Sequence, residues 1–268
     1  MSFLQLVLLA VVQGITEFLP ISSSAHLNLV HLLTPLPDQG PLIDVSIHVG
    51  SLVAVMIYFW RDMLQLMQGA IDLLRGRWSE NAKLAAYLIL ASIPVFIVGF
   101  IMLETGMVDM MRTIAIIATA NLIFAILLYI ADRNSGEKPM GEIGLPQAML
   151  IGVMQILSLI PGVSRSGVTM TAARYMGYSR TEAARFSMLL AIPTILGAGA
   201  GASLELYKSG NAVLQGEAVV AGGLSFITAL VAIWAMMAWL KHMSFTPFVV
   251  YRLALSVLLF AVLAAGWR

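Results

Sequence analysis

The chain has 268 residues, of which 60% are hydrophobic and 11% are charged, and its mean hydropathy is +0.91. A soluble domain carries about 25% charged residues and under about 50% apolar ones, so these values exclude the soluble class and indicate a protein that crosses the membrane several times. The net charge of +1 gives no reason to expect a nucleic-acid partner, and the absence of cysteine excludes disulfides, thiolate nucleophiles and cysteine-ligated metals.

The first segment of the chain is apolar but too short to cross a membrane. No basic residues precede it and no small-residue cleavage site follows, so we expect mature structure rather than a signal peptide. A membrane-crossing helix needs about 20 residues, whereas the apolar run from Phe3 to Val12 soon meets Gln13 and Glu17. The turn-forming sequence LPISSSAH at 19–26 follows. This segment is therefore predicted to enter the membrane and return.

Six longer apolar stretches predict membrane-spanning helices. In chain order they lie near 42–60, 84–103, 113–131, 186–205, 218–240 and 248–266. Between the third and the fourth stretch, the polar linker 132–146 contains glycine and proline, and a second short apolar segment covers 147–160. The second short segment also ends in a turn, IPGVSRSGVT at 160–169, and is predicted to return to the side from which it came.

The basic residues predict the orientation, because Lys and Arg near the ends of spans are retained in the cytoplasm. One orientation places eleven of them inside: Arg61, Arg75, Arg77, Lys83, Arg133, Lys138, Arg174, Arg180, Arg185, Lys241 and Arg252. It leaves Arg112, Lys208 and Arg268 outside and Arg165 within the membrane region. In this orientation the first short segment enters from the outer face and the second from the cytoplasmic face.

Two similar hairpins inserted from opposite faces are typical of an inverted repeat whose broken helices meet near the membrane midplane. We therefore predict an all-α polytopic membrane protein with six transmembrane helices and two re-entrant helical hairpins. Residues 1–268 form one domain, with repeats at approximately 1–131 and 147–268 joined by the cytoplasmic linker 132–146. Irregular backbone at membrane depth is tolerated only where it is buried or lines a wet cavity, so the two hairpin tips should line a polar cavity.

The polar side chains of the two hairpin tips form the candidate site. The first tip contributes Gln13, Glu17, Ser22, Ser23, Ser24 and His26, and the second contributes Ser164, Arg165, Ser166 and Thr169. A carboxylate such as Glu17 at membrane depth needs a partner, and Arg165 occupies the equivalent place in the other repeat. This pair alone could simply hold the hairpins together, but the histidine and the hydroxyl groups around it favour a functional site.

The SRSG sequence that follows Pro161 and Gly162 predicts a turn that opens a helix. Free amides at a helix N-terminus, together with the Arg165 guanidinium, suit a phosphate. The apolar bundle around the site suggests that this phosphate is carried on a lipid. Glu17 and Gln13 offer oxygen ligands of the kind that Mg²⁺ or Ca²⁺ takes together with phosphate oxygens.

Ser23 and His26 are the candidates for the chemical step, and the residues leave their roles open. Ser23 could attack phosphorus with His26 as its base, or His26 could itself be the nucleophile. In either case Arg165 would offset the charge on the phosphoryl group during transfer. Asp44 and His48, four residues apart near the outer end of the first long span, could support the site from behind or be an ordinary helix-start Asp and a mouth-facing His.

Two long motifs resemble those of a known family. QGITEFLPISSSAH at 13–26 and PGVSRSGVT at 161–169 are similar to the signature motifs of the bacterial undecaprenyl-diphosphate phosphatase family, the bacitracin-resistance type of integral membrane phosphatase. The similarity extends through DVSIHVGSLVAVMIYFWRD at 44–62 to SFTPFVVYR at 244–252. The resemblance implies removal of the terminal phosphate of undecaprenyl diphosphate with a divalent metal, which recycles the lipid carrier of cell-wall precursors. It also implies a location in the bacterial inner membrane, with the site open to the outer, periplasmic face.

The resemblance implies roles for individual residues as well. The family's essential glutamate, serine, histidine and arginine match Glu17, Ser23, His26 and Arg165. Its phosphate-binding residues match Ser164, Ser166 and Thr169, and Ser22 and Ser24 are predicted to bind phosphate with them. Gln13 stands where the family has Glu or Gln, so Glu17 would be the only acidic metal ligand at this place.

Two other functions are compatible with this organisation. A secondary transporter is usually built from inverted repeats with broken helices, and Glu17 with Arg165 could then couple ions. A lipid-binding protein without chemistry is the second alternative. His26 with the serine cluster favours the phosphatase, because a carrier of anions needs no proton-transfer pair. The expected partners are the polyprenyl diphosphate and membrane lipids, with no nucleic acid, and a homodimer is left open.

Overall fold

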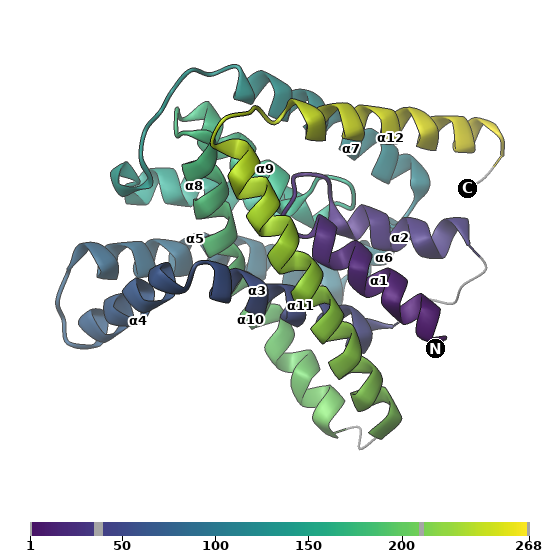
Figure 1. The fold of residues 1–268 in the computed structure, drawn as a ribbon, viewed down its shortest axis with the longest axis horizontal. Coiled ribbons are helices and arrows are strands. Elements are labelled where there is room, and N and C mark those ends of the chain that lie inside the picture. The colour runs from purple at the N-terminus through teal and green to yellow at the C-terminus, as the bar shows by residue number, and fades with distance from the viewer. Residues whose placement is uncertain (1, 35–39, 209–211, 267–268) are drawn as a thin grey trace.

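The computed structural model describes residues 2–34, 40–208 and 212–266, without the side chains of residues 31, 33, 41, 109, 198, 200–208, 212 and 213. All regular structure in these residues is helical (Figure 1), apart from an isolated bridge between Lys138 and Tyr178. The α-helices are α1 (Phe3–Thr16), α2 (Ser23–Leu33), α3 (Pro41–Tyr58), α4 (Trp60–Leu74), α5 (Glu80–Glu104), α6 (Met107–Met110), α7 (Ile114–Asp132), α8 (Leu145–Gln155), α9 (Arg165–Tyr175), α10 (Arg180–Lys208), α11 (Ala212–Leu240) and α12 (Thr246–Ala264). Two short 3₁₀ segments are η1 (Met140–Glu142) and η2 (Ile156–Leu159).

Local sequence signals set many of the helix boundaries. The hydroxyl groups of Ser2, Ser22, Ser79, Thr113 and Ser164 each accept a hydrogen bond from a backbone N–H in the first turn of the helix that follows. Prolines stand in the first turns of α3, α8 and α12, where a missing N–H costs nothing. Glycines with positive φ follow the ends of α4, α5, α9 and α12.

Several helices are long and apolar enough to cross a membrane. α5, α7, α11 and α12 each qualify alone, and α3 with α4 qualifies as a bent pair. The described residues thus give four crossing helices, or five if the bent pair is one span, and the chain is a multi-pass membrane protein. The predicted all-helical class is confirmed, whereas the number of six spans stays a prediction. The predicted span 186–205 falls on α10, whose side chains lie partly outside the described residues.

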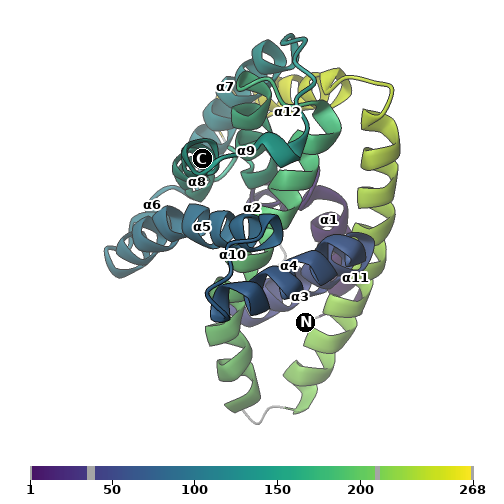
Figure 2. The same cartoon turned by 90° about the vertical axis from the view of Figure 1, so that its left-hand side faces the viewer.

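The predicted first span, 42–60, ends in a sharp change of direction that the sequence did not indicate. α3 stops at Tyr58, and α4 leaves at an angle of 91° to pack along α5 (Figure 2). Asp62 of α4 lies 2.5 Å from the Nη2 atom of Arg185 on α10, so an ion pair fixes the start of the new direction. Residues that the sequence placed in an interhelical connection therefore form a helix of their own.

Each short apolar segment forms a helical hairpin. α1 packs on α11 and α8 packs on α5, and each contact is made through a glycine that lets the backbones approach closely. A Cβ atom at Gly14 would lie 1.9 Å from Thr228 Oγ1, and one at Gly152 would lie 2.2 Å from the Ala91 carbonyl oxygen. The two hairpins are therefore wedged against different long helices.

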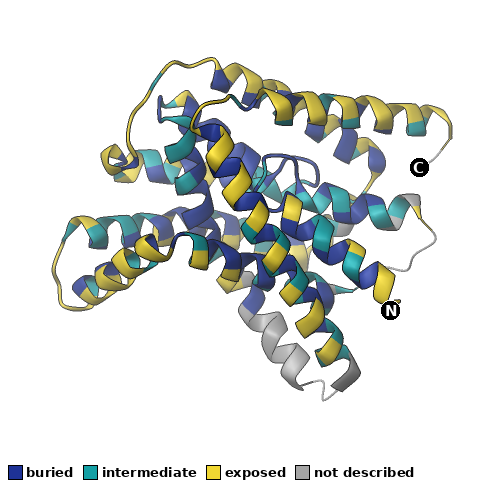
Figure 3. Cartoon of the chain, in the orientation of Figure 1, coloured by how far each residue is buried: buried dark blue, intermediate teal, exposed yellow. Residues whose placement is uncertain are grey.

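The turns of the two hairpins meet in the interior. α7 and α12 lie side by side across one end of the molecule, while α3 packs against both α10 and α11 (Figures 1 and 2). Buried residues concentrate around the turns, and the outward sides of α5, α11 and α12 are largely exposed (Figure 3). Ser166 Oγ of the second hairpin donates to the Leu19 carbonyl of the first at 2.8 Å. The fold thus brings two distant parts of the sequence into contact.

Candidate active site

A cavity of about 310 Å³ lies where the two hairpins meet α3 and α10. Its lining residues are Glu17, Ser22, Ser23, Ser24, Asp44, Val45, His48, Ser158, Ser164, Arg165, Thr194, Ile195 and Gly199. Ser23 is the first residue of α2 and Arg165 is the first residue of α9, so the N-termini of both hairpin helices open on this cavity. The cavity brings together most of the side chains that the sequence singled out.

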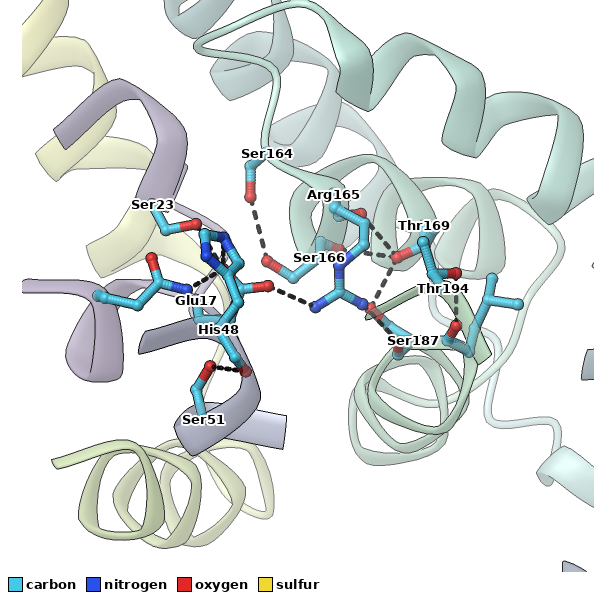
Figure 4. Close-up of polar contacts among 12 residues, drawn as sticks. Glu17, Ser23, His48, Ser51, Ser164, Arg165, Ser166, Thr169, Ser187 and Thr194 are labelled. Atoms are coloured by element: carbon cyan, nitrogen blue, oxygen red, sulfur yellow. Dashed lines mark hydrogen bonds and ion pairs between the residues drawn. The ribbon is translucent and has the colours of Figure 1, made fainter. Parts of the chain in front are cut away.

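Glu17 lies at the centre of the polar contacts and is only 7% exposed (Figure 4). Its Oε1 atom lies 3.2 Å from Nη2 of Arg165. Its Oε2 atom accepts hydrogen bonds from the Ser23 hydroxyl at 2.6 Å and from Gln13 Nε2 at 2.8 Å. The Nε2 atom of His48 lies 3.7 Å from the same oxygen. A single carboxylate therefore links side chains from α1, α2, α3 and α9.

The guanidinium of Arg165 is held from the side opposite Glu17. Its Nη1 atom donates to the Ser187 carbonyl of α10 at 3.2 Å, and its centre lies 5.6 Å from the centre of the Phe18 ring. Thr169 Oγ1 lies 2.7 Å from Ser187 Oγ and also donates to the Arg165 carbonyl at 2.8 Å. These contacts fix the orientation of the Arg165 fork.

The predicted phosphate-binding hydroxyl groups fall into two sets. Ser22, Ser24 and Ser164 line the cavity. Ser166 and Thr169 are buried behind it, where their hydroxyl groups bond to backbone carbonyls, so the structure places them as supports of the turn and of Arg165. Their predicted phosphate contact remains a prediction.

His26 does not line the cavity. Its Nδ1 atom lies 2.7 Å from the Ser22 carbonyl, and its Nε2 atom lies 2.5 Å from the Tyr251 hydroxyl, whose ring stacks on the imidazole at 5.7 Å. A carbonyl can only accept, so we assign the proton to Nδ1, which leaves Nε2 to accept from Tyr251. The Ser23 hydroxyl donates to Glu17 instead. The predicted pairing of Ser23 with His26 is therefore not present in this arrangement.

His48 is the histidine that lines the cavity. Its Nδ1 atom donates to the Asp44 carbonyl at 2.6 Å, which directs Nε2 towards Glu17. Asp44 lines the cavity at the start of the same helix. The spacing of four residues identified this pair in the sequence, but it did not indicate that His48, rather than His26, would line the cavity beside Glu17.

The donor set for a divalent cation is small. No group of three His, Asp or Glu side chains suited to a metal ion occurs in the described part of the chain. However, the Oε1 atom of Gln13 is buried without a hydrogen-bond partner among the described residues, and its Nε2 atom donates to Glu17. Mg²⁺ is commonly held by one or two protein ligands together with substrate phosphates and water. Gln13 and Glu17 fit an ion that the substrate helps to bind.

Arg252 is a residue whose surroundings the sequence did not indicate. It was counted among the basic residues that flank a cytoplasmic link, but it lies within α12 and is fully buried. Its guanidinium bonds to backbone carbonyls in the turns of both hairpins. An arginine inside an otherwise apolar helix was the signal that could have singled it out. Without Arg252 the predicted orientation still rests on ten basic residues inside against three outside.

Comparisons with known proteins extend the motif resemblance to the whole chain. The sequence model for the bacitracin resistance protein BacA matches residues 6–258. A protein named undecaprenyl-diphosphatase from Jannaschia sp. (strain CCS1) is 48% identical over 264 residues, which cover 98% of this chain and 99% of the relative. One of the same name from Roseobacter denitrificans is 46% identical over 261 residues, covering 97% and 98%. Undecaprenyl-diphosphatase 1 from Rhodospirillum rubrum is 42% identical over 273 residues, covering 99% and 97%.

Proposed function

The chain belongs to the family of the bacitracin resistance protein BacA, and from this premise we propose that it is an integral membrane phosphatase. Its reaction is the hydrolysis of undecaprenyl diphosphate to undecaprenyl phosphate and inorganic phosphate, which recycles the lipid carrier for cell-wall synthesis. The observation that carries the proposal is the contact of Glu17 with both Ser23 and Arg165 in one cavity. The names of relatives that match over nearly their whole length support the substrate.

Phosphate binding falls to Arg165 and to the two helix N-termini. The fork of Arg165 can hold two phosphate oxygens at once, and the helix-start amides beside Ser23 and Ser164 supply donors that a helix leaves unpaired. Both groups are fixed before binding, so little reorganisation is needed when charge develops on the phosphoryl group.

The contact between Ser23 and Glu17 favours a serine nucleophile with a carboxylate base. In the first step the Ser23 oxygen bonds to the terminal phosphorus, Glu17 accepts the hydroxyl proton, and the bond between that phosphorus and the bridging oxygen breaks. Undecaprenyl phosphate leaves with the bridging oxygen. In the second step water hydrolyses the phosphoserine and releases inorganic phosphate. The 2.6 Å hydrogen bond from Ser23 to Glu17 supports this assignment.

A divalent cation, Mg²⁺ or Ca²⁺, is part of the proposal. Glu17 and the unpartnered Oε1 atom of Gln13 would hold it together with phosphate oxygens. When bound, it would offset negative charge on the phosphoryl group during transfer.

We also propose six membrane-spanning helices and two re-entrant hairpins arranged as an inverted repeat, with repeats near 1–131 and 147–268. The same interval of 142 residues separates Gln13 from Gln155 and Ser22 from Ser164. Ser22 and Ser164 share a positive φ, of 73° and 74°, and both cap the helix that follows. The distribution of basic residues supports a site open to the outer face of the bacterial inner membrane.

Phosphate release from a polyprenyl diphosphate by the purified chain in detergent tests the proposed function. We expect release with Mg²⁺ or Ca²⁺, loss of release with a chelator, and loss of release in Glu17→Gln. Glu182→Gln is a matched control, because Glu182 accepts hydrogen bonds from Arg185 and from the Met140 backbone N–H and does not line the cavity. Release by the parent no greater than by Glu17→Gln would overturn the proposal.

A further inference from the structure

Arg252 of α12 binds the turns of both hairpins from behind the cavity. Its Nη1 atom donates to the Pro20 carbonyl of the first hairpin at 3.2 Å. Its Nη2 atom donates to the carbonyls of Gly162 and Val163 in the second hairpin at 2.8 and 3.1 Å. One planar group therefore fixes backbone atoms from both halves of the chain relative to each other.

The surroundings of Arg252 allow its guanidinium little freedom. Asn121 of α7 accepts a hydrogen bond from Arg252 Nε at 2.7 Å, and its amide donates to the Arg252 carbonyl at 2.8 Å and to Ser256 Oγ at 3.0 Å. A Cβ atom at Gly167 would lie 3.0 Å from Arg252 Nη1, so the guanidinium packs closely against the first turn of α9. The side chain is held at its base and at its tip.

Arg252 is also a buried cation whose partners are neutral. None of the ion pairs in the described residues includes it, whereas Glu17 and Arg165 offset each other. Burying a charge without a counter-ion is strongly unfavourable. Fold stability alone therefore does not account for an arginine at this place, and a diphosphate in the adjacent cavity would bring the missing negative charge.

We propose that Arg252 is a positioning residue for the phosphatase reaction, an inference that rests on the proposed function. Pro20 stands three residues before Ser23, and Val163 stands two residues before Arg165. By holding both turns, Arg252 sets the distance between the nucleophile and the phosphate-binding arginine. Its positive charge also strengthens the attraction of the cavity for an anion.

Arg252→Lys tests the geometric part, because lysine keeps the charge and loses the fork. With the full chain in detergent and a polyprenyl diphosphate, we expect kcat to fall about ten- to a hundredfold and KM to stay within about twofold. Arg252→Gln removes the charge as well, so KM should also rise. A fall in kcat with unchanged KM distinguishes positioning from lost binding.

Arg174→Lys is the matched control. Arg174 is 1% exposed and donates to the carbonyls of Gly136, Asn134 and Tyr178 at the linker, but it does not line the cavity. We expect both lysine variants to lower the thermal unfolding temperature and only Arg252→Lys to lower kcat. Equal falls in kcat for the two variants, or a parental kcat in Arg252→Lys, would overturn the proposal.

Two further outcomes are decisive. If Arg252→Lys yields no folded protein, Gly167→Ala takes its place, since its added Cβ atom lies 3.0 Å from Arg252 Nη1 and presses on the guanidinium without changing charge. The same Cβ atom lies 3.0 Å from Ser164 Cβ, so Ser164→Ala is measured beside it. A kcat of Gly167→Ala at least tenfold below that of Ser164→Ala then supports the positioning role, and a kcat equal to that of Ser164→Ala or of the parent overturns it. If the parent itself releases no phosphate, the proposed function fails, which is a different result from an active parent with an unaffected Arg252→Lys.

Discussion

Glu17 contacts four other side chains of the candidate site. Its two carboxylate oxygens form an ion pair with Arg165 and accept hydrogen bonds from Ser23 and Gln13, and the Nε2 atom of His48 lies 3.7 Å from one of them. Charge-assisted hydrogen bonds of this kind are short and directional, so the carboxylate fixes both the serine hydroxyl and the arginine fork. A substitution at any one of these side chains will change the position of the others.

Arg165→Lys is expected to lower kcat/KM about ten- to a hundredfold, because a single ammonium cannot replace a bidentate guanidinium on phosphate, a loss of about 1.5–3 kcal/mol. Steady-state phosphate release measures the effect. Arg185→Lys is the control, since Arg185 pairs with Asp62 away from the cavity and should keep kcat/KM within about twofold. Parental turnover in Arg165→Lys would make the pair with Glu17 purely architectural.

Substitutions of Ser23 and His26 test which of the two residues is the nucleophile. If Ser23 is the nucleophile and His26 is held outside the cavity, Ser23→Ala should be nearly inactive. His26→Gln and Tyr251→Phe should both stay within about tenfold of the parent, which is less than the 10²- to 10⁴-fold loss expected on removing a general base. Rapid quench with labelled substrate provides the second measurement. An acid-labile, base-stable phosphoenzyme would identify a phosphohistidine and contradict the serine assignment.

The sequence allowed the meeting of Glu17 with Arg165 to be predicted, because an intramembrane carboxylate needs a cation and one was available in the other repeat. It did not show the direction of His26. This residue lies four positions after Ser22, so its Nδ1 atom bonds to the Ser22 carbonyl within the first helical turn, and its Nε2 atom meets Tyr251 rather than Ser23. Arg252 was missed because its partners are three backbone carbonyls and the neutral side chain of Asn121, which no pattern of charged residues records.

At the scale of elements, the two serine turns are the strained parts of the fold. Ser22 and Ser164 are the non-glycine residues with positive φ in the described chain, and each still caps its helix. Such backbone costs about 1–3 kcal/mol per residue and persists only where surrounding contacts enforce it. The hydrogen bonds of Arg252 and of Ser166 to these turns supply that constraint.

Two substitutions of Ser164 distinguish the energetic cost of its positive φ from the contribution of its capping hydrogen bond. Ser164→Ala loses the hydrogen bond from the Gly167 N–H and keeps the strain, so the free energy of unfolding should fall by about 0.5–2 kcal/mol. Ser164→Gly loses the same bond but relieves the strain, and should be the more stable of the two by about 1 kcal/mol or more. Denaturant titration in detergent measures both variants.

Thr113 provides the comparison for this pair of substitutions, since it caps α7 with an ordinary φ of −115°. The difference in the free energy of unfolding between Thr113→Gly and Thr113→Ala should therefore favour glycine less than the same pair of substitutions does at Ser164. An equal advantage at the two positions would show that the turn of the second hairpin stores no strain.

The hairpins themselves were predictable because proline, glycine and serine interrupt apolar segments that are too short to span. The bend between α3 and α4 was not predictable from local pattern. The bend falls at Phe59, and residues 55–63 contain no proline or glycine. The direction of α4 depends instead on its packing against α5 and on the ion pair of Asp62 with Arg185. Contacts between residues more than a hundred positions apart are absent from any local reading of a sequence.

At the scale of the whole molecule, the proposed orientation places the linker 132–146 in the cytoplasm. A cysteine at Ser135, an exposed position of this linker, should not react with an impermeant thiol reagent applied to intact cells. A cysteine at Thr34, at the exposed end of α2, should react. Each is compared with the same variant in permeabilised cells, where both should react. Labelling of Ser135→Cys from outside would contradict the proposed inverted repeat.

The position of Arg252 in the last helix has a consequence for synthesis. Both hairpins, α3 and α10 leave the ribosome before α12 does. The hydrogen bonds that join the turns of the two hairpins, however, come from Arg252 of α12. A nascent chain that has already inserted α11 would hold every group that touches substrate without the contact that sets their spacing. Activity should therefore begin only when the final twenty or so residues are in the membrane. A chain released before α12 is made should therefore be inserted in the membrane but inactive.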